Sequence, residues 1–144
     1  METNDAHPDP AELAQRLGHA FVQPERLAAA LTHRSFSAEA GQPELAESQR
    51  LEFLGDAVLG AIAAEWLVMR RPDWREGQLT KVRSRLTNAA ALARVARRLE
   101  LGRFLRLGRG EAREGGRARD SLLADALEAV LGALWLDGGA EAVR

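Results

Sequence analysis

The stretch RLEFLGDAVLG, residues 50–60, begins a long apolar segment that carries two acidic side chains at helical spacing. Glu52 and Asp56 are four residues apart, so they project from the same face of a helix. Like charges at that spacing repel each other and weaken a helix slightly. Between Leu51 and Met69 the remaining acid is Glu65. The segment is therefore predicted to be a largely buried helix whose acidic pair needs an explanation.

A second apolar helix is predicted at residues 121–136, SLLADALEAVLGALWL, where Asp125 and Glu128 share one face. A buried carboxylate is costly unless it is ion-paired, protonated or bound to a cation. Buried ion pairs are one interpretation, although neither acidic pair has an Arg or Lys at i±3 or i±4, and the nearest cation is Arg50. Two facing acidic pairs would instead form an all-oxygen site suited to Mg²⁺ or Mn²⁺. Two such ions can activate water in phosphodiester hydrolysis.

Three glycines, Gly55, Gly60 and Gly132, lie inside these two predicted helices. Each costs about 1 kcal/mol relative to alanine in a helix interior. A close approach of two helices would offset that cost, so we favour packing glycines over glycines that are merely tolerated.

The rest of the chain is also helical in pattern, and no segment alternates in the way that is typical of a strand. We therefore predict an all-α fold. Asp9 is a candidate N-cap before Pro10, and Gly18 is a candidate stop. Helices are predicted at residues 10–17, 24–31, 48–69, 77–86, 89–100 and 121–136, with loops at 35–48 and 108–119. Asn88 is expected to cap the fifth of these helices and Gly102 to stop it.

A single helical domain is predicted over residues 10–144, after a disordered N-terminal tail at residues 1–9. Ala140 to Arg144 has the character of the first turn of a further helix. One isolated turn is unfavourable to nucleate. We therefore expect the chain to be a piece of a longer protein.

Composition limits the possible classes. The chain has no cysteine, which excludes a disulfide framework and a thiolate metal site. No signal peptide and no membrane span is predicted, in keeping with a cytoplasmic protein. The net charge of −1 is unevenly spread: residues 1–69 carry −7, residues 70–119 carry +10, and residues 120–144 carry −4. The arginine-rich centre is either a solvated surface or a phosphate-binding flank beside an acidic site.

The stretch RLEFLGDAVL strongly resembles the motif of the ribonuclease III family, the double-strand-specific endoribonucleases. Further blocks resemble the family in order and spacing, and together they cover roughly residues 10–140. The arrangement is more similar to the ordinary bacterial enzyme than to the short mini type. The blocks are ALTHRSF at 30–36, EGQLTKVRSRLTN at 76–88, LGRFLRLGRGE at 101–111 and SLLADALEAVLGALWLDGG at 121–139.

This resemblance implies an all-α endonuclease domain that forms a symmetric homodimer and cuts double-stranded RNA, ribosomal precursors among them. The expected products carry 5′-phosphate and 3′-hydroxyl ends with a short 3′ overhang. By position, Glu52, Asp125 and Glu128 fall where the family binds divalent metal, expected here to be Mg²⁺ with Mn²⁺ as a substitute. Asp56 and Glu128 fall where the family places its catalytic acids.

Other positions carry weaker implications. Phe53 matches a residue that packs across the family's dimer interface, although an ordinary core position is the alternative. Glu76 matches an acid near the family's site, or else lies in a solvated turn. Gln49 stands where many bacterial members have Glu, which leaves the electrostatic contribution of that position in doubt. Nothing here resembles the double-stranded-RNA-binding domain that usually follows, so RNA affinity is expected to suffer.

Duplex RNA is recognised by shape and by phosphate contacts, which suits an arginine-rich segment with few aromatic residues. Residues 76–119 contain one aromatic, Phe104. Arg113, Arg117 and Arg119, in the expected loop, are candidate phosphate contacts.

The chain has three histidines, His7, His19 and His33, and none lies at helical spacing from the acidic pairs. This counts against a Glu-x-x-His di-iron site, and His33 is expected to be structural. Two other functions stay open. One is a non-catalytic RNA-binding scaffold of the same fold, and the other is an all-α Mg²⁺-dependent nucleotide pyrophosphohydrolase.

Overall fold

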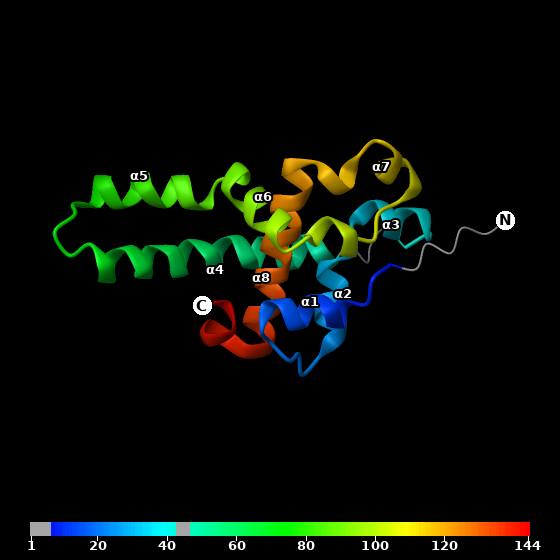
Figure 1. Ribbon diagram of the computed structural model, residues 1–144, viewed down its shortest axis with the longest axis horizontal. Helices are drawn as coiled ribbons and strands as arrows, with labels where there is room; N and C mark the ends of the chain where they lie inside the picture. The colour runs from blue at the N-terminus through cyan, green and yellow to red at the C-terminus, as the bar shows by residue number, and fades with distance from the viewer. Residues whose placement is uncertain (1–6, 43–46) are drawn as a thin grey trace.

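The computed structural model describes residues 7–42 and 47–144, which are mostly helical (Figure 1). These residues form no β-strand, and an isolated bridge pairs Thr32 with Arg106. The predicted all-α fold is confirmed. The helices are α1 (Pro10–Leu17), α2 (Pro24–Ala30), α3 (Arg34–Glu39), α4 (Glu47–Arg70), α5 (Glu76–Thr87), α6 (Ala89–Arg98), the 3₁₀ helix η2 (Leu101–Phe104), α7 (Arg109–Arg113), the 3₁₀ helix η3 (Gly116–Ala118) and α8 (Asp120–Val143).

The two long helices α4 and α8 cross at the centre of the molecule, and α2 and α6 also pack against α8 (Figure 1). The α4–α5 hairpin extends beyond the other helices, and α5 contributes no buried residue. The hydrophobic core therefore surrounds α8 and the N-terminal half of α4.

Helix α8 is apolar on most of its circumference because neighbouring helices cover it on several sides. Leu123, Val130 and Ala133 are buried, as are Leu13 of α1 and Phe104 of η2, which pack into the same cluster. The burial of α8 explains why the sequence of this helix shows so little polar face.

Glycine sets the distance between α4 and α8. A Cβ atom on Gly55 would lie 1.7 Å from the Glu128 carbonyl oxygen, and one on Gly132 would lie 2.2 Å from the Leu51 carbonyl oxygen. The packing interpretation is confirmed for these two residues. It is wrong for Gly60 within this chain, because a Cβ there would meet no atom within 4 Å.

Several predicted helix ends are confirmed. The Asp9 side chain accepts a hydrogen bond from the Ala11 amide, and Gly18 ends α1 in the left-handed region at φ 69°. The Asn88 side chain caps α6 by accepting from the Ala91 amide. Gly102 is not the stop, because α6 ends at Arg98 and Gly102 lies inside η2.

Both predicted loops contain helix. α3 starts one residue before the expected loop at 35–48 and covers its first part, and the His33 ring caps it by accepting a hydrogen bond from the Ser35 amide. α7 and η3 lie within the expected loop at 108–119. There Arg117 donates to the carbonyl oxygens of Gly102 and Leu105, which holds the segment against η2.

Helix α8 is longer than the predicted helix at residues 121–136. Helical structure continues to Val143, with a break at Gly139, whose φ of 66° and ψ of −157° are not helical. The helix thus extends past the predicted end at residue 136, and the expected turn that begins at Ala140 is present after the break.

None of the helices in residues 7–42 and 47–144 is long and apolar enough to cross a membrane. The predicted tail at residues 1–9 falls mostly on residues 1–6, which lie outside the described part, as do residues 43–46 of the predicted loop. Residues 7–9 precede α1 without regular structure.

Candidate metal-binding carboxylate centre

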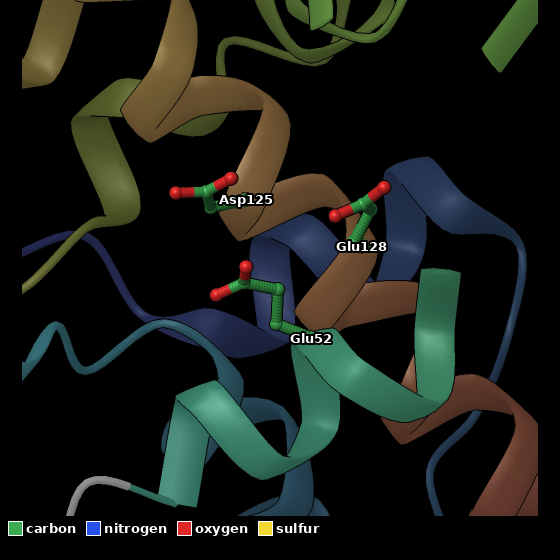
Figure 2. Close-up of side chains that lie close together, drawn as sticks. All are labelled: Glu52, Asp125 and Glu128. Atoms are coloured by element: carbon green, nitrogen blue, oxygen red, sulfur yellow. The ribbon is translucent and has the colours of Figure 1, made fainter. Parts of the chain in front are cut away.

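Three carboxylates converge where α4 and α8 cross. Glu52 projects from α4, and Asp125 and Glu128 project from α8 toward the same space (Figure 2). One oxygen from each carboxylate lies within 4.8 Å of the others. We call Glu52, Asp125 and Glu128 the carboxylate centre. Because Gly55 lies against the backbone of Glu128, the close helix crossing and the carboxylate centre have the same structural origin.

The carboxylate centre lacks compensating ion pairs. Glu52 and Glu128 are half-buried and Asp125 is exposed. Across residues 7–42 and 47–144, which contain every arginine and lysine of the chain, none of the three forms an ion pair. The arginine-pairing interpretation is therefore wrong. The charge of Arg34, at the start of α3, acts on both Glu52 and Asp125 from beyond ion-pair distance.

The pKa values of the three carboxyl groups are all raised. Burial and the neighbouring charges of Asp56, Glu52 and Asp125 raise the pKa of Glu128 to about 7. Burial, followed by the charges of Asp125 and Asp56, raises the pKa of Glu52. Burial also raises the pKa of Asp125, although His33 and Arg34 oppose that rise. Each shift records the free energy of holding negative charge in a cluster without a cation.

Asp56, one turn after Glu52 on α4, adjoins the carboxylate centre without belonging to its close group. It is exposed, and its negative charge helps to raise the pKa of Glu128. The structure thus brings together all four acids that the sequence singled out, three as a compact cluster and Asp56 beside Glu128.

Glu76 lies away from these four residues within the chain. It begins α5, beyond the end of α4, and its carboxylate accepts a hydrogen bond from the Thr80 hydroxyl. Glu52 and Arg70 are 18 residues apart on α4, which corresponds to a rise of about 27 Å. Glu76 therefore does not share the carboxylate centre of its own chain.

The candidate arginines of residues 108–119 have different surroundings. Arg117 is half-buried and bonded to backbone carbonyls, which gives it a structural role. Arg119 pairs with Glu111 at 2.6 Å. Arg113 is exposed and, within the described residues, forms no ion pair.

Sequence reasoning assigned no role in the site to two residues of the ALTHRSF block, Arg34 and His33. Both act electrostatically on Asp125. Their signal was their position in a motif block, since helical spacing from the acids could not reveal them.

The donor set of the carboxylate centre fits a hard divalent cation. Carboxylate oxygens are the ligands preferred by Mg²⁺ and Mn²⁺, which complete their coordination with water. A bound cation would offset the cost of burying the three carboxylates and the repulsion that raises the pKa of Glu52 and Glu128. Glu52, Asp125 and Glu128 are therefore the residues that could hold it.

Comparison with known proteins agrees with this fold. The family model described as Ribonuclease-III-like matches residues 23–144. Ribonuclease 3 of Heliobacterium modesticaldum is 54% identical over 135 residues, which are 94% of this chain and 57% of that protein. Ribonuclease 3 of Ectopseudomonas mendocina is 48% identical over 137 residues, 95% of this chain and 57% of that protein. The chain belongs to the ribonuclease III family.

Solved structures identify the part of the family to which the chain corresponds. A nuclease domain of ribonuclease III from Campylobacter jejuni, studied for flexibility in a region involved in dimer formation, matches with a TM-score of 0.83 at 38% identity. The match covers 92% of this chain and 89% of that one. A second structure of that domain gives a TM-score of 0.82. The chain thus corresponds to the nuclease domain and spans about 57% of the length of the curated relatives named above.

Proposed function

We propose that this chain is a divalent-metal-dependent endoribonuclease that cuts double-stranded RNA. The observation that carries the proposal is the carboxylate centre: three acids from two helices, within 4.8 Å of one another and without ion pairs, in a member of the ribonuclease III family. A structural role would favour neutral or paired side chains at this helix crossing, because unpaired carboxylates there destabilise the fold.

The four acids have two roles in the proposed reaction, cation binding and proton transfer. Glu52, Asp125 and Glu128 would hold Mg²⁺, or Mn²⁺ in its place. When bound, the cation supplies Lewis acidity and lowers the pKa of a water molecule. Asp56 lies beside Glu128 and its charge acts on that carboxylate, so Asp56 is placed to accept or return a proton beside the reacting phosphate. Hydrolysis on this pattern leaves 5′-phosphate and 3′-hydroxyl ends, with short 3′ overhangs on duplex RNA.

The proposed active form is a homodimer. The Phe53 side chain is 82% exposed although it lies on α4 beside the buried Leu51, which argues against the ordinary core position. A groove of about 540 Å³ adjoins it, lined in part by Leu54 and Leu136. An apolar projection beside an apolar groove suits a twofold interface, in which each copy offers both parts to the other. The related Campylobacter jejuni domain has a region involved in dimer formation.

The basic part of the chain supports duplex RNA as the substrate. α5 has no buried residue and presents Lys81, Arg83 and Arg85 to solvent, while Arg70 is the last residue of α4 and Arg71 follows it. These cations lie on the hairpin that projects from the core (Figure 1). Arg70 and Arg71 lie over the rings of Trp66 and Trp74, at 4.8 and 5.0 Å from the ring centroids. Exposed cations of this kind suit phosphate contacts along A-form RNA. Ribosomal precursors as substrates and a cytoplasmic location stay predictions from the sequence.

The decisive experiment is cleavage of a long RNA duplex with Mg²⁺ at low salt by the parent chain and by Glu128→Gln. The parent is expected to produce short duplexes, and the variant to be slower by about 10³-fold or more, because it loses a cation ligand and a proton-transfer group. Low salt keeps phosphate contacts strong. Glu100→Gln, the same change in an exposed ion pair, serves as the control and should cut at the parental rate.

The two alternatives give different results in that experiment. A scaffold would bind the duplex and dimerise, and neither protein would cut it. A pyrophosphohydrolase would leave the duplex intact and hydrolyse nucleoside triphosphates in a Glu128-dependent reaction. Either outcome would contradict the proposal.

A further inference from the structure

His33 lies beside the carboxylate centre with one ring nitrogen committed to the fold. Its Nδ1 accepts a hydrogen bond from the Ser35 amide at 3.2 Å and lies 2.7 Å from the Ser35 Oγ. The same hydroxyl accepts from the Gly108 amide at 2.9 Å, which ties the start of α3 to the segment before α7. A backbone amide can only donate, so Nδ1 carries no proton. The neutral His33 ring therefore carries its proton on Nε2.

The ring also lines a small cavity beside two of the acids. The cavity has a volume of about 40 Å³, and its polar lining comes from His33, Ser48, Gln49, Glu52 and Asp125. A water molecule needs about 10–15 Å³ of such volume and at least two polar partners. The cavity therefore has the size and polarity to hold ordered water between His33 and the carboxylates.

The Nε2–H group of His33 is free to donate a hydrogen bond. Within residues 7–42 and 47–144 the His33 ring forms hydrogen bonds with Ser35, and Nε2 has no protein partner. No direct hydrogen bond joins it to Asp125, although the two groups interact electrostatically. His33 and Asp125 line the same small cavity, so an unpartnered donor on the His33 ring is suited to a water-mediated contact with the acid.

We propose that His33 is a positioning residue of the carboxylate centre, whose Nε2–H orients the Asp125 carboxylate through a water molecule in this cavity. The inference rests on the proposed metal-dependent function. A group that fixes the orientation of a ligating carboxylate raises cation affinity without touching the cation. His33 is not itself a ligand in this arrangement, because its unprotonated nitrogen is already occupied by the Ser35 amide.

Two variants test the contacts of the two His33 ring nitrogens separately. In His33→Asn, the asparagine oxygen can still cap α3 by accepting from the Ser35 amide, but the side chain is too short to donate across the cavity. In Ser35→Ala, the hydroxyl contacts with Nδ1 and Gly108 are lost while Nε2–H remains. The first variant removes the proposed positioning contact, and the second weakens the local structure.

Calorimetry with Mn²⁺ on RNA-free protein gives a readout that does not depend on activity. His33→Asn is expected to bind Mn²⁺ about 10- to 100-fold more weakly with a melting temperature near that of the parent. Its cleavage rate should recover at high Mn²⁺ concentration. Ser35→Ala is expected to melt earlier and to keep its Mn²⁺ affinity within about threefold of the parent, well short of that range.

Two outcomes would overturn the inference. His33→Asn could bind Mn²⁺ as tightly as the parent, or Ser35→Ala could lose as much affinity as His33→Asn in step with its loss of stability. If the parent binds Mn²⁺ and cuts RNA in these cases, the proposed function survives without the His33 contact. If the parent itself neither binds Mn²⁺ nor cuts, the proposed function fails, and the inference fails with it.

Discussion

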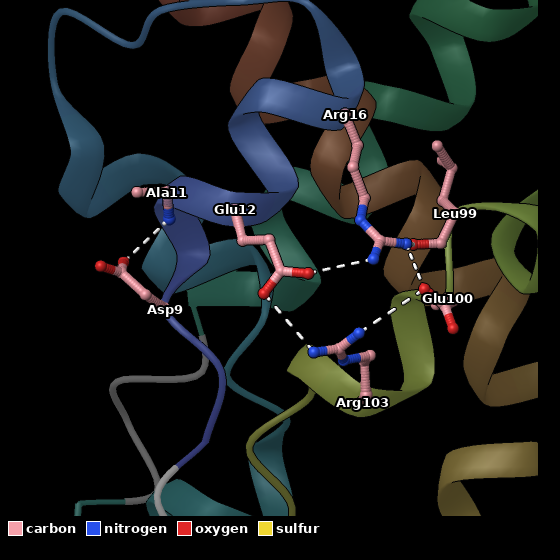
Figure 3. Close-up of polar contacts among 7 residues, drawn as sticks. All are labelled: Asp9, Ala11, Glu12, Arg16, Leu99, Glu100 and Arg103. Carbon is pink, nitrogen blue, oxygen red and sulfur yellow. Dashed lines mark hydrogen bonds and ion pairs between the residues drawn. The ribbon is translucent and has the colours of Figure 1, made fainter.

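Two groups of acidic residues in this domain have opposite electrostatic surroundings. In the carboxylate centre, Glu128 has a pKa raised to about 7 by burial and by neighbouring acids. A second group, which we call the surface network, consists of Glu12, Arg16, Glu100 and Arg103 and joins α1 to η2 (Figure 3). There the guanidinium of Arg16 holds the pKa of Glu100 below its usual range. A glutamate carboxylate is thus disfavoured as an anion at Glu128 and stabilised as an anion at Glu100. Of these two groups, the carboxylate centre is the one that retains unsatisfied negative charge that could hold a cation.

In the surface network, each acidic side chain is paired with basic side chains. Arg16 contacts Glu12 at 3.0 Å and also pairs with Glu100, while Arg103 contacts Glu12 at 3.4 Å and Glu100 at 3.6 Å (Figure 3). Both guanidinium groups lie over the Phe104 ring, at 5.8 and 5.2 Å from its centroid. These solvent-exposed pairs fasten α1 to the turn after α6 and contribute little individually.

The largest effect on stability should come from separating the helices that bring the three acids together. Gly55→Ala would place a methyl group against the Glu128 carbonyl oxygen and force α4 away from α8. The expected loss in the free energy of unfolding is about 3 kcal/mol, by analogy with overpacked cores. Urea unfolding measures this loss, and Mn²⁺ affinity should fall in the same variant.

Gly60→Ala is the matched control, because a Cβ at Gly60 meets no atom within 4 Å. It should leave the protein as stable as the parent or up to about 1 kcal/mol more stable. Equal losses in the two variants would contradict the view that glycine sets the α4–α8 spacing.

The second effect is a dependence of stability on pH in the metal-free protein. The pKa of Glu128 is raised in the folded state from its ordinary value of 4.5 to about 7. The stability that comes from the protonated carboxyl is fully present below about pH 4.5 and is lost as pH rises through 7. Because Glu128 is only half-buried, the expected loss is about 1–2 kcal/mol.

Urea unfolding in EDTA at pH 5 and pH 8 measures this loss. Glu128→Gln should remove most of the difference, since glutamine does not titrate. Mg²⁺ should oppose the fall in the parent, because a cation favours the ionised carboxylates. Parallel pH profiles for parent and variant would mean that Glu128 does not carry the strain of the carboxylate centre.

The acidic site residues and the two long helices could be predicted from the sequence. The elements that were missed have a common physical cause. Burial cost and helical spacing indicated Glu52, Asp56, Asp125 and Glu128, and the bounds of α4 came within one residue of prediction. Both properties are local along the chain, so a single sequence contains them.

The missed elements depend on contacts between distant segments. α3 and α7 have six and five residues, which is too short for a helix to be stable alone. They are held by the bond from the Gly108 amide to Ser35 and by the Glu39 carboxylate, which accepts from the Gly110 amide at 3.4 Å. Spacing rules cannot detect a cap that comes from about 70 residues away in the chain.

The smallest effect is expected in the surface network, and its sign is opposite to that of Glu128. Because the hydrogen bond and charge of Arg16 lower the folded-state pKa of Glu100, the stabilisation is present above the ordinary value of 4.5 and is lost as pH falls through the lowered value. Glu100→Gln should therefore flatten the acid side of the stability profile, with a smaller effect than Glu128→Gln has between pH 5 and pH 8. Urea unfolding from pH 5 to pH 3 measures this effect at low salt, and high salt should reduce it. An unchanged acid side would show that Arg16 and Glu100 are not coupled in solution, whereas loss of RNA cleavage in Glu100→Gln would show that the two groups of acids are not independent.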